Sequence, residues 1–362
     1  CVELSAPDGR AQVMVAGDFQ GRVMTSSAQG DSGVSFGWIN YELIRSGQRK
    51  KQFNPFGGEE RFWLGPEGGQ YALYFSPGDS FSIEKWQVPA LIDTVPFDLR
   101  SATTAAATFS KEATLKNYKG TAFHLDIERT IRLLYDSLAD PWLNKADREG
   151  VDMVMYATEN RITNRGPADW RKEDGLLSVW LLGMMMPSPE TVVFLPFVPG
   201  PDSRSGITDS YFGKVPQDRL VIGDSLLVFK CDGAYRSKIG VSPAVARPVA
   251  ASMDFKRNIL NLVFFSIDPQ GDYVNSKWEW QREPFKGDVV NAYNDGPLKD
   301  GSQLGPFYEI ESSSPGLLLK KGQSHTYRQV TLHLQGSYER LQEIARKYTG
   351  ADLGQVRKPF NL

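Results

Sequence analysis

Apolar and polar residues alternate along much of the chain. Between residues 121 and 134, apolar Phe123, Leu125 and Ile127 take turns with polar neighbours. This period of two is typical of a strand with one buried face, since successive side chains of a strand point to opposite sides. Turn residues separate similar runs throughout. The predicted strands cover residues 11–19, 37–43, 70–75, 121–134, 152–164, 175–184, 191–197, 225–230, 259–266, 272–281, 307–313 and 325–335.

Only the C-terminal region has a helical pattern. Leu341, Ile344, Ala345 and Tyr348 are spaced as one face of a helix, and Ser337 and Gly350 are suitable residues to cap it. We therefore predict a short helix within residues 337–349. One helix after a dozen strands predicts an all-β fold of large packed antiparallel sheets. Because no linker-like segment interrupts the chain, we expect residues 1–362 to form a single domain.

Composition excludes some classes of function. The chain has 362 residues, with 41 Lys and Arg against 43 Asp and Glu. Such a balance lacks the basic footprint of a nucleic-acid-binding protein. Two cysteines, Cys1 and Cys231, provide neither a disulfide framework nor a zinc cluster. Bacterial lipoproteins begin with a lipid-bearing Cys, so Cys1 predicts an exported, periplasmic or outer-membrane lipoprotein; the alternative is that the sequence begins there by chance.

The densest group of unusual residues lies between positions 54 and 69. It combines two pairs of glycines with Glu60, Arg61 and Trp63. Glycines allow a backbone to approach a ligand, a guanidinium donates a fork of hydrogen bonds, and an indole can stack on a sugar face. We therefore take these three side chains as candidate substrate-binding residues. A structural turn with a buried Arg–Glu pair explains the segment equally well.

A second candidate site lies on the predicted strand 307–313. Glu309 and Glu311 point to the same face of that strand, roughly 7 Å apart along the chain. Two neighbouring carboxylates repel, so one can hold a proton at neutral pH and act in acid–base catalysis. They can also bind a cation such as calcium, or form structural ion pairs with Lys or Arg.

The third group lies in residues 273–296. If residues 272–281 form a strand, Trp278 and Trp280 share one of its faces, and Asn294 and Asp295 follow with groups that hydrogen-bond sugars. Aromatic and amide side chains together favour a carbohydrate site, although packing explains many aromatic residues.

A basic pair precedes this group along the chain. Arg236 and Lys238 share parity in the segment 232–239, so in an extended chain they face the same way. Arg236 is a candidate substrate-binding residue. Alternatively, both cations neutralise the acidic pair in a purely structural network.

Three of these segments carry a resemblance to a known family. Residues 54–69, the stretch Tyr293–Pro297 and the stretch Phe307–Pro315 resemble a bacterial family, common in Bacteroides-like gut organisms, of the galactose mutarotase-like (aldose 1-epimerase-like) superfamily. The resemblance implies a β-supersandwich whose concave face holds a carbohydrate. It also implies that Glu309 or Glu311 is the general base and that Arg61 holds sugar hydroxyls. The mid-chain histidine that acts as the acid in true mutarotases has no counterpart here.

From these patterns we expect a carbohydrate-active protein, with a sugar epimerase or mutarotase-like reaction as the leading hypothesis. Two alternatives stay open: a glycan-binding lipoprotein without catalysis, and a polysaccharide hydrolase or lyase. We expect no cofactor, apart from the calcium ion considered above. A carbohydrate ligand is the expected partner, and a lipid on Cys1 is the expected membrane contact.

Overall fold

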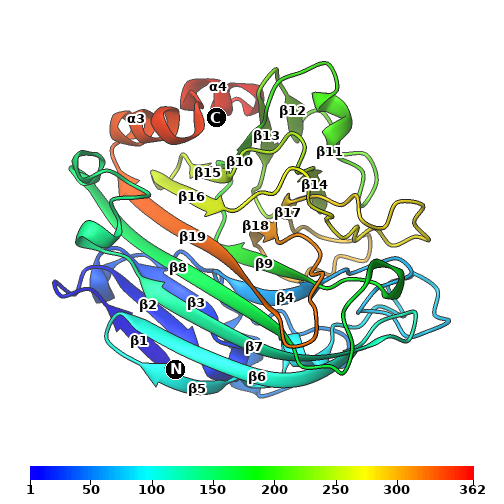
Figure 1. Ribbon diagram of the computed structural model, residues 1–362. Coiled ribbons are helices and arrows are strands. Elements are labelled where there is room, and N and C mark those ends of the chain that lie inside the picture. Colours follow the sequence, from blue (N-terminus) through cyan, green and yellow to red (C-terminus); the bar gives the residue numbers. More distant parts are fainter.

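A ten-stranded antiparallel sheet is the largest element of the computed structural model, which describes residues 1–362. It runs diagonally through the molecule in Figure 1, from β12 and β13 to β5. Its strands in spatial order are β12 (Leu220–Ile222), β13 (Leu226–Lys230), β10 (Thr191–Pro196), β15 (Val249–Asp254), β16 (Ile259–Phe265), β19 (Ser324–Gly336), β8 (Val151–Asn164), β7 (Ala122–Leu133), β6 (Ala106–Lys116) and β5 (Asp98–Ala102).

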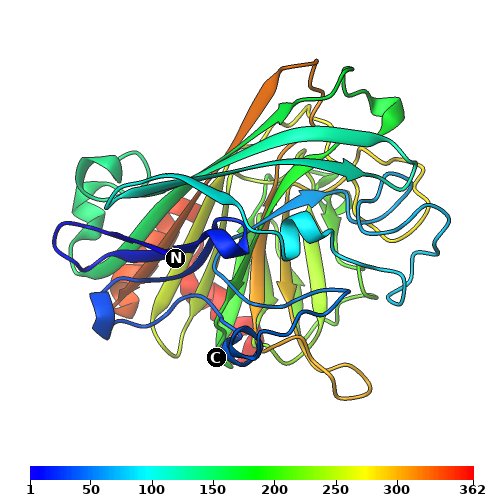
Figure 2. The same cartoon turned by 90° about the horizontal axis from the view of Figure 1, so that it is seen from below.

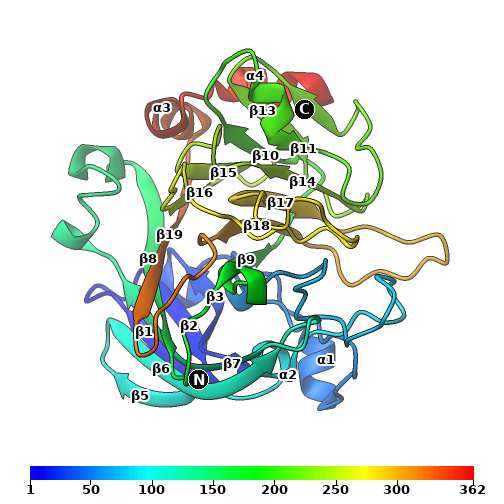
Figure 3. The ribbon, with the colours of Figure 1, turned by 45° about the vertical axis from the view of Figure 1, so that its right-hand side comes forward.

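Two smaller antiparallel sheets pack against this large one. The six-stranded sheet lies beside β10, β15 and β16 in Figure 3. Its order is β11 (Ile207–Thr208), β14 (Ser237–Val241), β17 (Val290–Asn294), β18 (Tyr308–Ser313), β9 (Ser178–Met185) and β4 (Arg61–Gly65). The three-stranded sheet joins β1 (Val2–Ser5), β2 (Gln12–Ala16) and β3 (Arg22–Ser27), and it is seen in blue from below in Figure 2.

Helices are few and short. They are α1 (Tyr41–Ser46), α2 (Ala90–Asp93), α3 (Tyr338–Thr349) and α4 (Leu353–Arg357). The Ser337 hydroxyl accepts a hydrogen bond from the Arg340 amide at 3.2 Å at the start of α3, and Gly350 ends the helix in the left-handed conformation. No helix of the structure is both long and apolar enough to cross a membrane.

Apolar side chains fill two separate regions. A cluster of 67 buried residues contains side chains from all three sheets and fills the space between them. A second cluster, of 21 residues, lies between α3 and α4 and the other face of the large sheet; it includes Leu332 and Leu334 of β19 and Leu341 and Ile344 of α3. The sheets thus cover one face of the large sheet, whereas the helices cover only part of the other face, which stays exposed along β5 and β7.

The predicted all-β, mutarotase-like fold with a C-terminal helix is confirmed. Three predicted strands are wrong. Residues 37–43 make only isolated bridges before α1, residues 70–75 form turns, and residues 272–281 form a loop with one bridge at Tyr273. Trp278 and Trp280 therefore share no strand face, because no ladder sets an alternation there.

Candidate functional site

The face of the six-stranded sheet that points away from the large sheet carries the candidate site. Along β18, Tyr308, Ile310 and Ser312 point into the protein core, whereas Glu309 and Glu311 point to the opposite face. The same alternation brings other side chains to that face from the remaining strands. They are Arg61 and Trp63 of β4, Trp180, Leu182 and Met184 of β9, Lys238 of β14 and Tyr293 of β17.

Above this face is a cleft of about 570 Å³, which we call the cleft from here on. Loops that follow β4 and precede β17 contribute to its walls; they extend on the same side of the molecule in Figure 1. Its volume falls in the range of small-molecule sites. Its aromatic lining consists of Phe53, Trp63, Trp86, Trp180, Phe212, Trp278, Tyr293 and Phe307.

The Glu309 carboxyl group accepts a hydrogen bond from Arg61 Nη2 at the floor of the cleft. Both side chains are buried, with Glu309 only 5% exposed and Arg61 2%. Burial raises the pKa of Glu309 to about 8; the Arg61 guanidinium opposes this shift and the nearby Glu311 carboxylate adds to it. Nε and Nη1 of Arg61 have no acceptor in the protein, and its guanidinium lies 4.6 Å from the centre of the Trp63 ring. The Arg61 fork therefore keeps donors free for a ligand.

Glu311 has different partners. Its Oε2 accepts hydrogen bonds from Lys238 Nζ at 2.8 Å and from Trp180 Nε1 at 2.9 Å. Its Oε1 is buried and has no partner. The Lys238 ammonium also lies 4.8 Å from the centre of the Trp180 ring. Burial by itself lowers the pKa of Lys238. The negative charges of the nearby glutamates, mainly Glu311, raise it by more, so the pKa of Lys238 is raised overall.

A third carboxyl group lies beside these two. Asp295 accepts hydrogen bonds from the Tyr293 hydroxyl at 2.5 Å and from the Gly305 amide at 3.0 Å. Burial raises the pKa of Asp295, although both hydrogen bonds and the nearby Arg236 oppose the shift. Arg236 itself stacks over the Phe212 ring, 4.5 Å from its centre.

Glu67 is a fourth acid, on the loop after β4. It accepts a hydrogen bond from Trp86 Nε1 at 2.9 Å, and burial raises its pKa. The next residue, Gly68, lies so close to the loop 276–281 that a Cβ there would be 2.3 Å from the Lys277 carbonyl oxygen. Only glycine allows so close an approach. The approach helps to hold Trp278 at the cleft, where its ring stacks on Trp86 with 5.8 Å between the ring centres.

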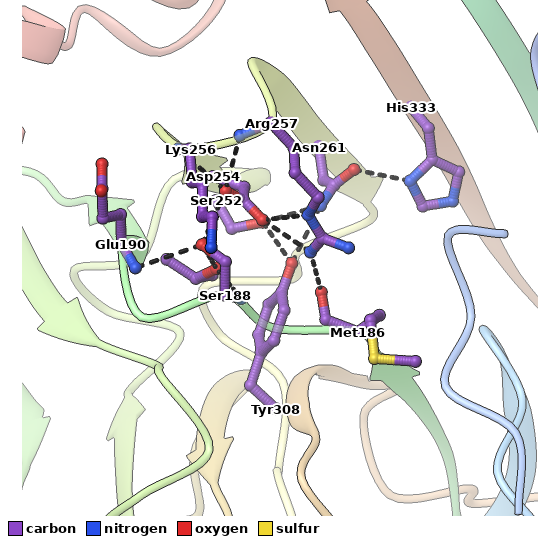
Figure 4. A network of polar contacts seen from close by, with 11 residues as sticks. Met186, Ser188, Glu190, Ser252, Asp254, Lys256, Arg257, Asn261, Tyr308 and His333 are labelled. Atoms are coloured by element: carbon purple, nitrogen blue, oxygen red, sulfur yellow. Dashed lines mark hydrogen bonds and ion pairs between the residues drawn. The ribbon is translucent and has the colours of Figure 1, made fainter. Parts of the chain in front are cut away.

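Behind β18, a polar network fixes the strand from its core side. Figure 4 shows the Tyr308 hydroxyl of β18 reaching Ser252 and Asn261 of the large sheet, at 2.8 and 2.9 Å. Asn261 continues the network to Nδ1 of His333, and the other ring nitrogen of His333 contacts Glu59 at 3.0 Å. Burial raises the pKa of Tyr308, which keeps its hydroxyl protonated. The two glutamates thus stand on a strand whose opposite side is hydrogen-bonded in place.

The chain matches a known protein family over nearly its whole length. Residues 1–360 match the model of a family described as a family of unknown function, DUF6786. The chain belongs to this family. A search of curated proteins finds no match to the sequence.

Solved structures resemble this DUF6786 chain over nearly its whole length. A galactose mutarotase-like protein from Lactobacillus casei is 10% identical, with a TM-score of 0.52 over 92% of this chain and 99% of the other. A protein of Escherichia coli K12 assigned to the aldose 1-epimerases is 12% identical, with a TM-score of 0.53 over 92% and 98%. The Slr1438 protein of Synechocystis is 12% identical, with a TM-score of 0.54 over 93% and 96%. At these identities the likeness shows the fold.

The structure brings most of the predicted site residues together. The cleft is lined by Arg61, Trp63, Arg236, Trp278, Asp295, Glu309 and Glu311. Three others lie elsewhere. Glu60, directly before β4, points to the core, where Arg129 and Gln329 each donate a hydrogen bond to it at 2.8 Å. Asn294 is also on the core side of its strand and holds the backbone at Gly233, while Trp280 is 70% exposed outside the cleft.

Other cleft residues were not among the predicted site residues. Trp180 lies on a strand that is buried on both faces, so no alternation of polar and apolar residues marks it. Glu67 and Trp86 lie in loops without a periodic pattern. Lys238 could be found from the sequence, because it shares parity with Arg236. As that pattern suggested, Lys238 forms an ion pair with one of the acidic residues, Glu311.

The structure gives no support to a calcium ion at the two glutamates. No three His, Cys, Asp or Glu side chains gather in an arrangement that could hold a metal ion. Glu309 and Glu311 contact Arg61 and Lys238 instead.

Proposed function

We propose that this protein binds a carbohydrate in the cleft and interconverts its anomers, as an aldose 1-epimerase-type enzyme. The observation that carries the proposal is the pair of buried carboxyl groups on one face of β18. They stand in different surroundings, with Arg61 beside Glu309 and Lys238 and Trp180 beside Glu311. Two carboxyl groups in unequal environments are a common arrangement for proton donor and acceptor.

The walls of the cleft suit a sugar ring. Indole and phenyl faces can pack against the C–H face of a pyranose, while hydroxyl groups need donors and acceptors at the ring edge. Arg61 offers free N–H groups, and Glu311 offers an unpartnered oxygen. The cleft thus combines aromatic surfaces with unsatisfied polar groups of both kinds.

The reaction needs two proton transfers. In the proposed mechanism, Glu311 takes the proton of the anomeric hydroxyl while Glu309 gives its proton to the ring oxygen, and the bond between C1 and the ring oxygen breaks. The open aldehyde rotates about its C1–C2 bond. Both protons then return as the ring closes on the other face of C1, so the enzyme regains its starting state. A pKa of about 8 suits Glu309 for this exchange near neutral pH.

The test is to follow freshly dissolved α-anomers of neutral and acidic aldoses by NMR with and without the protein. We expect faster anomer exchange for at least one sugar. Glu309→Gln and Glu311→Gln should each lower that rate by about 10²–10⁴-fold, the usual contribution of a general acid or base. Glu159→Gln, on an exposed ion pair of β8, is the matched control and should keep the full rate. Unchanged exchange in both cleft variants would remove the two glutamates from the mechanism.

Glycan binding without catalysis is the second candidate function. It is favoured by two observations: each of the two carboxyl groups is held by a cation of the protein, and no histidine lines the cleft. This function predicts measurable sugar affinity by calorimetry with no acceleration of anomer exchange for any sugar tested. The two experiments together separate binding from turnover.

We also propose that Cys1 carries a lipid that anchors the protein after export. The Cys1 side chain is exposed, whereas Cys231 is buried. Mass spectrometry of the N-terminal peptide from the native membrane fraction should find a diacylglyceryl adduct on Cys1. An unmodified N-terminal peptide in the soluble fraction alone would contradict this proposal.

A further inference from the structure

We infer that the carbohydrate bound in the cleft carries an anionic group, and that Arg236 is the residue that binds it. This inference rests on the proposed function, since it names the substrate class of the same cleft. It follows from the distribution of paired and unpaired charges among the cleft residues.

Arg236 is a half-buried cation without a partner. It lies just before β14, and the 4.5 Å stacking over Phe212 fixes the plane of its guanidinium. Its Nε is buried without an acceptor, and none of its other nitrogens makes a hydrogen bond or ion pair within the protein. The buried Nε–H has lost its water without gaining an acceptor, and an anion placed beside the guanidinium would satisfy it. The protein leaves this guanidinium preorganised and unsatisfied.

The nearest acid does not neutralise it. Asp295 is close enough to interact electrostatically with Arg236, but its carboxyl oxygens are engaged by Tyr293 and by the Gly305 amide. Burial also raises the pKa of Asp295. Arg236 therefore remains available to a ligand.

The charges of the whole cleft point the same way. Five cations line it: Lys50, Lys51, Arg61, Arg236 and Lys238. Arg61 and Lys238 are paired with the two glutamates of β18, whereas Lys50 and Lys51 at the edge have no ion pair.

The acids of the cleft are fewer than its cations. Glu67 and Asp295 are the two cleft acids outside the β18 pairs, and both have pKa values raised by burial. Five cations thus stand against four acids, and Lys50, Lys51 and Arg236 have no ion pair within the protein; such a cleft attracts a negatively charged sugar in preference to a neutral one.

The fork of Arg236 fits a planar carboxylate or a tetrahedral oxyanion with two parallel hydrogen bonds. The ligand class is therefore a uronic acid, a sugar sulfate or a sugar phosphate. These three classes share an anionic group on a pyranose, and binding measurements distinguish among them.

The test is calorimetric binding of galacturonate, glucuronate, galactose 6-sulfate, galactose 6-phosphate and neutral galactose and glucose to the full chain. We expect at least one acidic sugar to bind about tenfold or more tightly than its neutral counterpart, with an affinity that falls as salt rises. In Arg236→Met, affinity for that acidic sugar should fall by about tenfold or more, and affinity for the neutral sugar should stay the same. Arg45→Met is the matched control, because Arg45 is an exposed, unpaired arginine over Tyr41 at 5.7 Å and lies outside the cleft.

The outcomes separate this inference from the proposed function. Equal affinity for acidic and neutral sugars, or an equal loss of both in Arg236→Met, overturns the anionic substrate and leaves the carbohydrate cleft standing. Binding of no sugar at all overturns both. If the acidic sugars differ in affinity, the one that binds most tightly identifies the anionic group as a carboxylate, a sulfate or a phosphate.

Discussion

The raised pKa of Glu309 predicts a specific dependence of stability on pH. In the folded protein this carboxyl holds its proton up to about pH 8, against an ordinary value of 4.5 in the unfolded chain. Between these values the unfolded state releases the proton that the folded state keeps, so folding becomes less favourable as pH rises. The slope is about 1.4 kcal/mol per pH unit, and the whole shift corresponds to about 5 kcal/mol. Glu309 makes its full contribution to the free energy of unfolding at pH values below its pKa in the unfolded chain. This contribution is lost as the pH rises through its pKa in the folded protein.

The variant Glu309→Gln removes this titration while retaining an acceptor for Arg61. Urea unfolding of both proteins at several pH values between about 5 and 9 gives the free energy of unfolding of each. We expect the wild-type advantage over Glu309→Gln to shrink by about 1.4 kcal/mol per pH unit up to about pH 8, and to level off above it. Other groups titrate in both proteins and cancel in the difference.

Glu159→Gln on the exposed face of β8 serves as the control, and its difference from the wild type should stay flat with pH. A flat difference for Glu309→Gln as well would refute the reasoning. It would mean that Arg61 keeps Glu309 ionised throughout, and the assignment of Glu309 as proton donor would fall with it.

The remaining predictions concern the surroundings of the cleft. Lys238→Met should lower the free energy of unfolding by about 3–5 kcal/mol, because it leaves the Glu311 carboxylate buried and unpaired, and the double variant with Glu311→Gln should recover part of the loss in urea unfolding. If the double variant recovers none of the lost stability, Lys238 and Glu311 are not energetically coupled. Tyr308→Phe should cost about 1 kcal/mol in the same assay, through the loss of hydrogen bonds that hold β18 from behind; no change would show that packing alone holds the strand. Trp278→Ala should weaken sugar binding in calorimetry by about 1 kcal/mol or more, whereas Trp280→Ala, an exposed change in the same loop, should not. Equal effects would place the sugar away from Trp278.

The sequence predicted the fold class and the long strands of the large sheet because half-buried strands alternate. The predicted strand 121–134 corresponds to β7, and 325–335 falls within β19. The pattern failed for residues 272–281, which are rich in aromatic residues. There Trp278 lies in a loop and packs on Trp86 and Phe75. An apolar residue is present because it packs beside the cleft, and not because the segment is a strand of a sheet.

The candidate site was predictable only along single strands. Period two correctly placed Glu309 and Glu311 on one face. The pairing of Arg61 with Glu309 depends on the order of β4, β9 and β18 in the sheet, and no local pattern encodes this order. Glu60 is a different case: it is adjacent to Arg61 in the chain, so period two alone sends it to the opposite, core side, where it pairs with Arg129.

The floor of the cleft is assembled from strands that are distant in the chain, from β4 at residue 61 to β18 at residue 313. No fragment of the protein presents these side chains together, so a ligand of the cleft binds the native molecule and not the unfolded one. Mass action then raises the midpoint of thermal unfolding in proportion to the logarithm of ligand concentration. A melting screen of sugars against the intact protein can therefore find the ligand before any activity is measured.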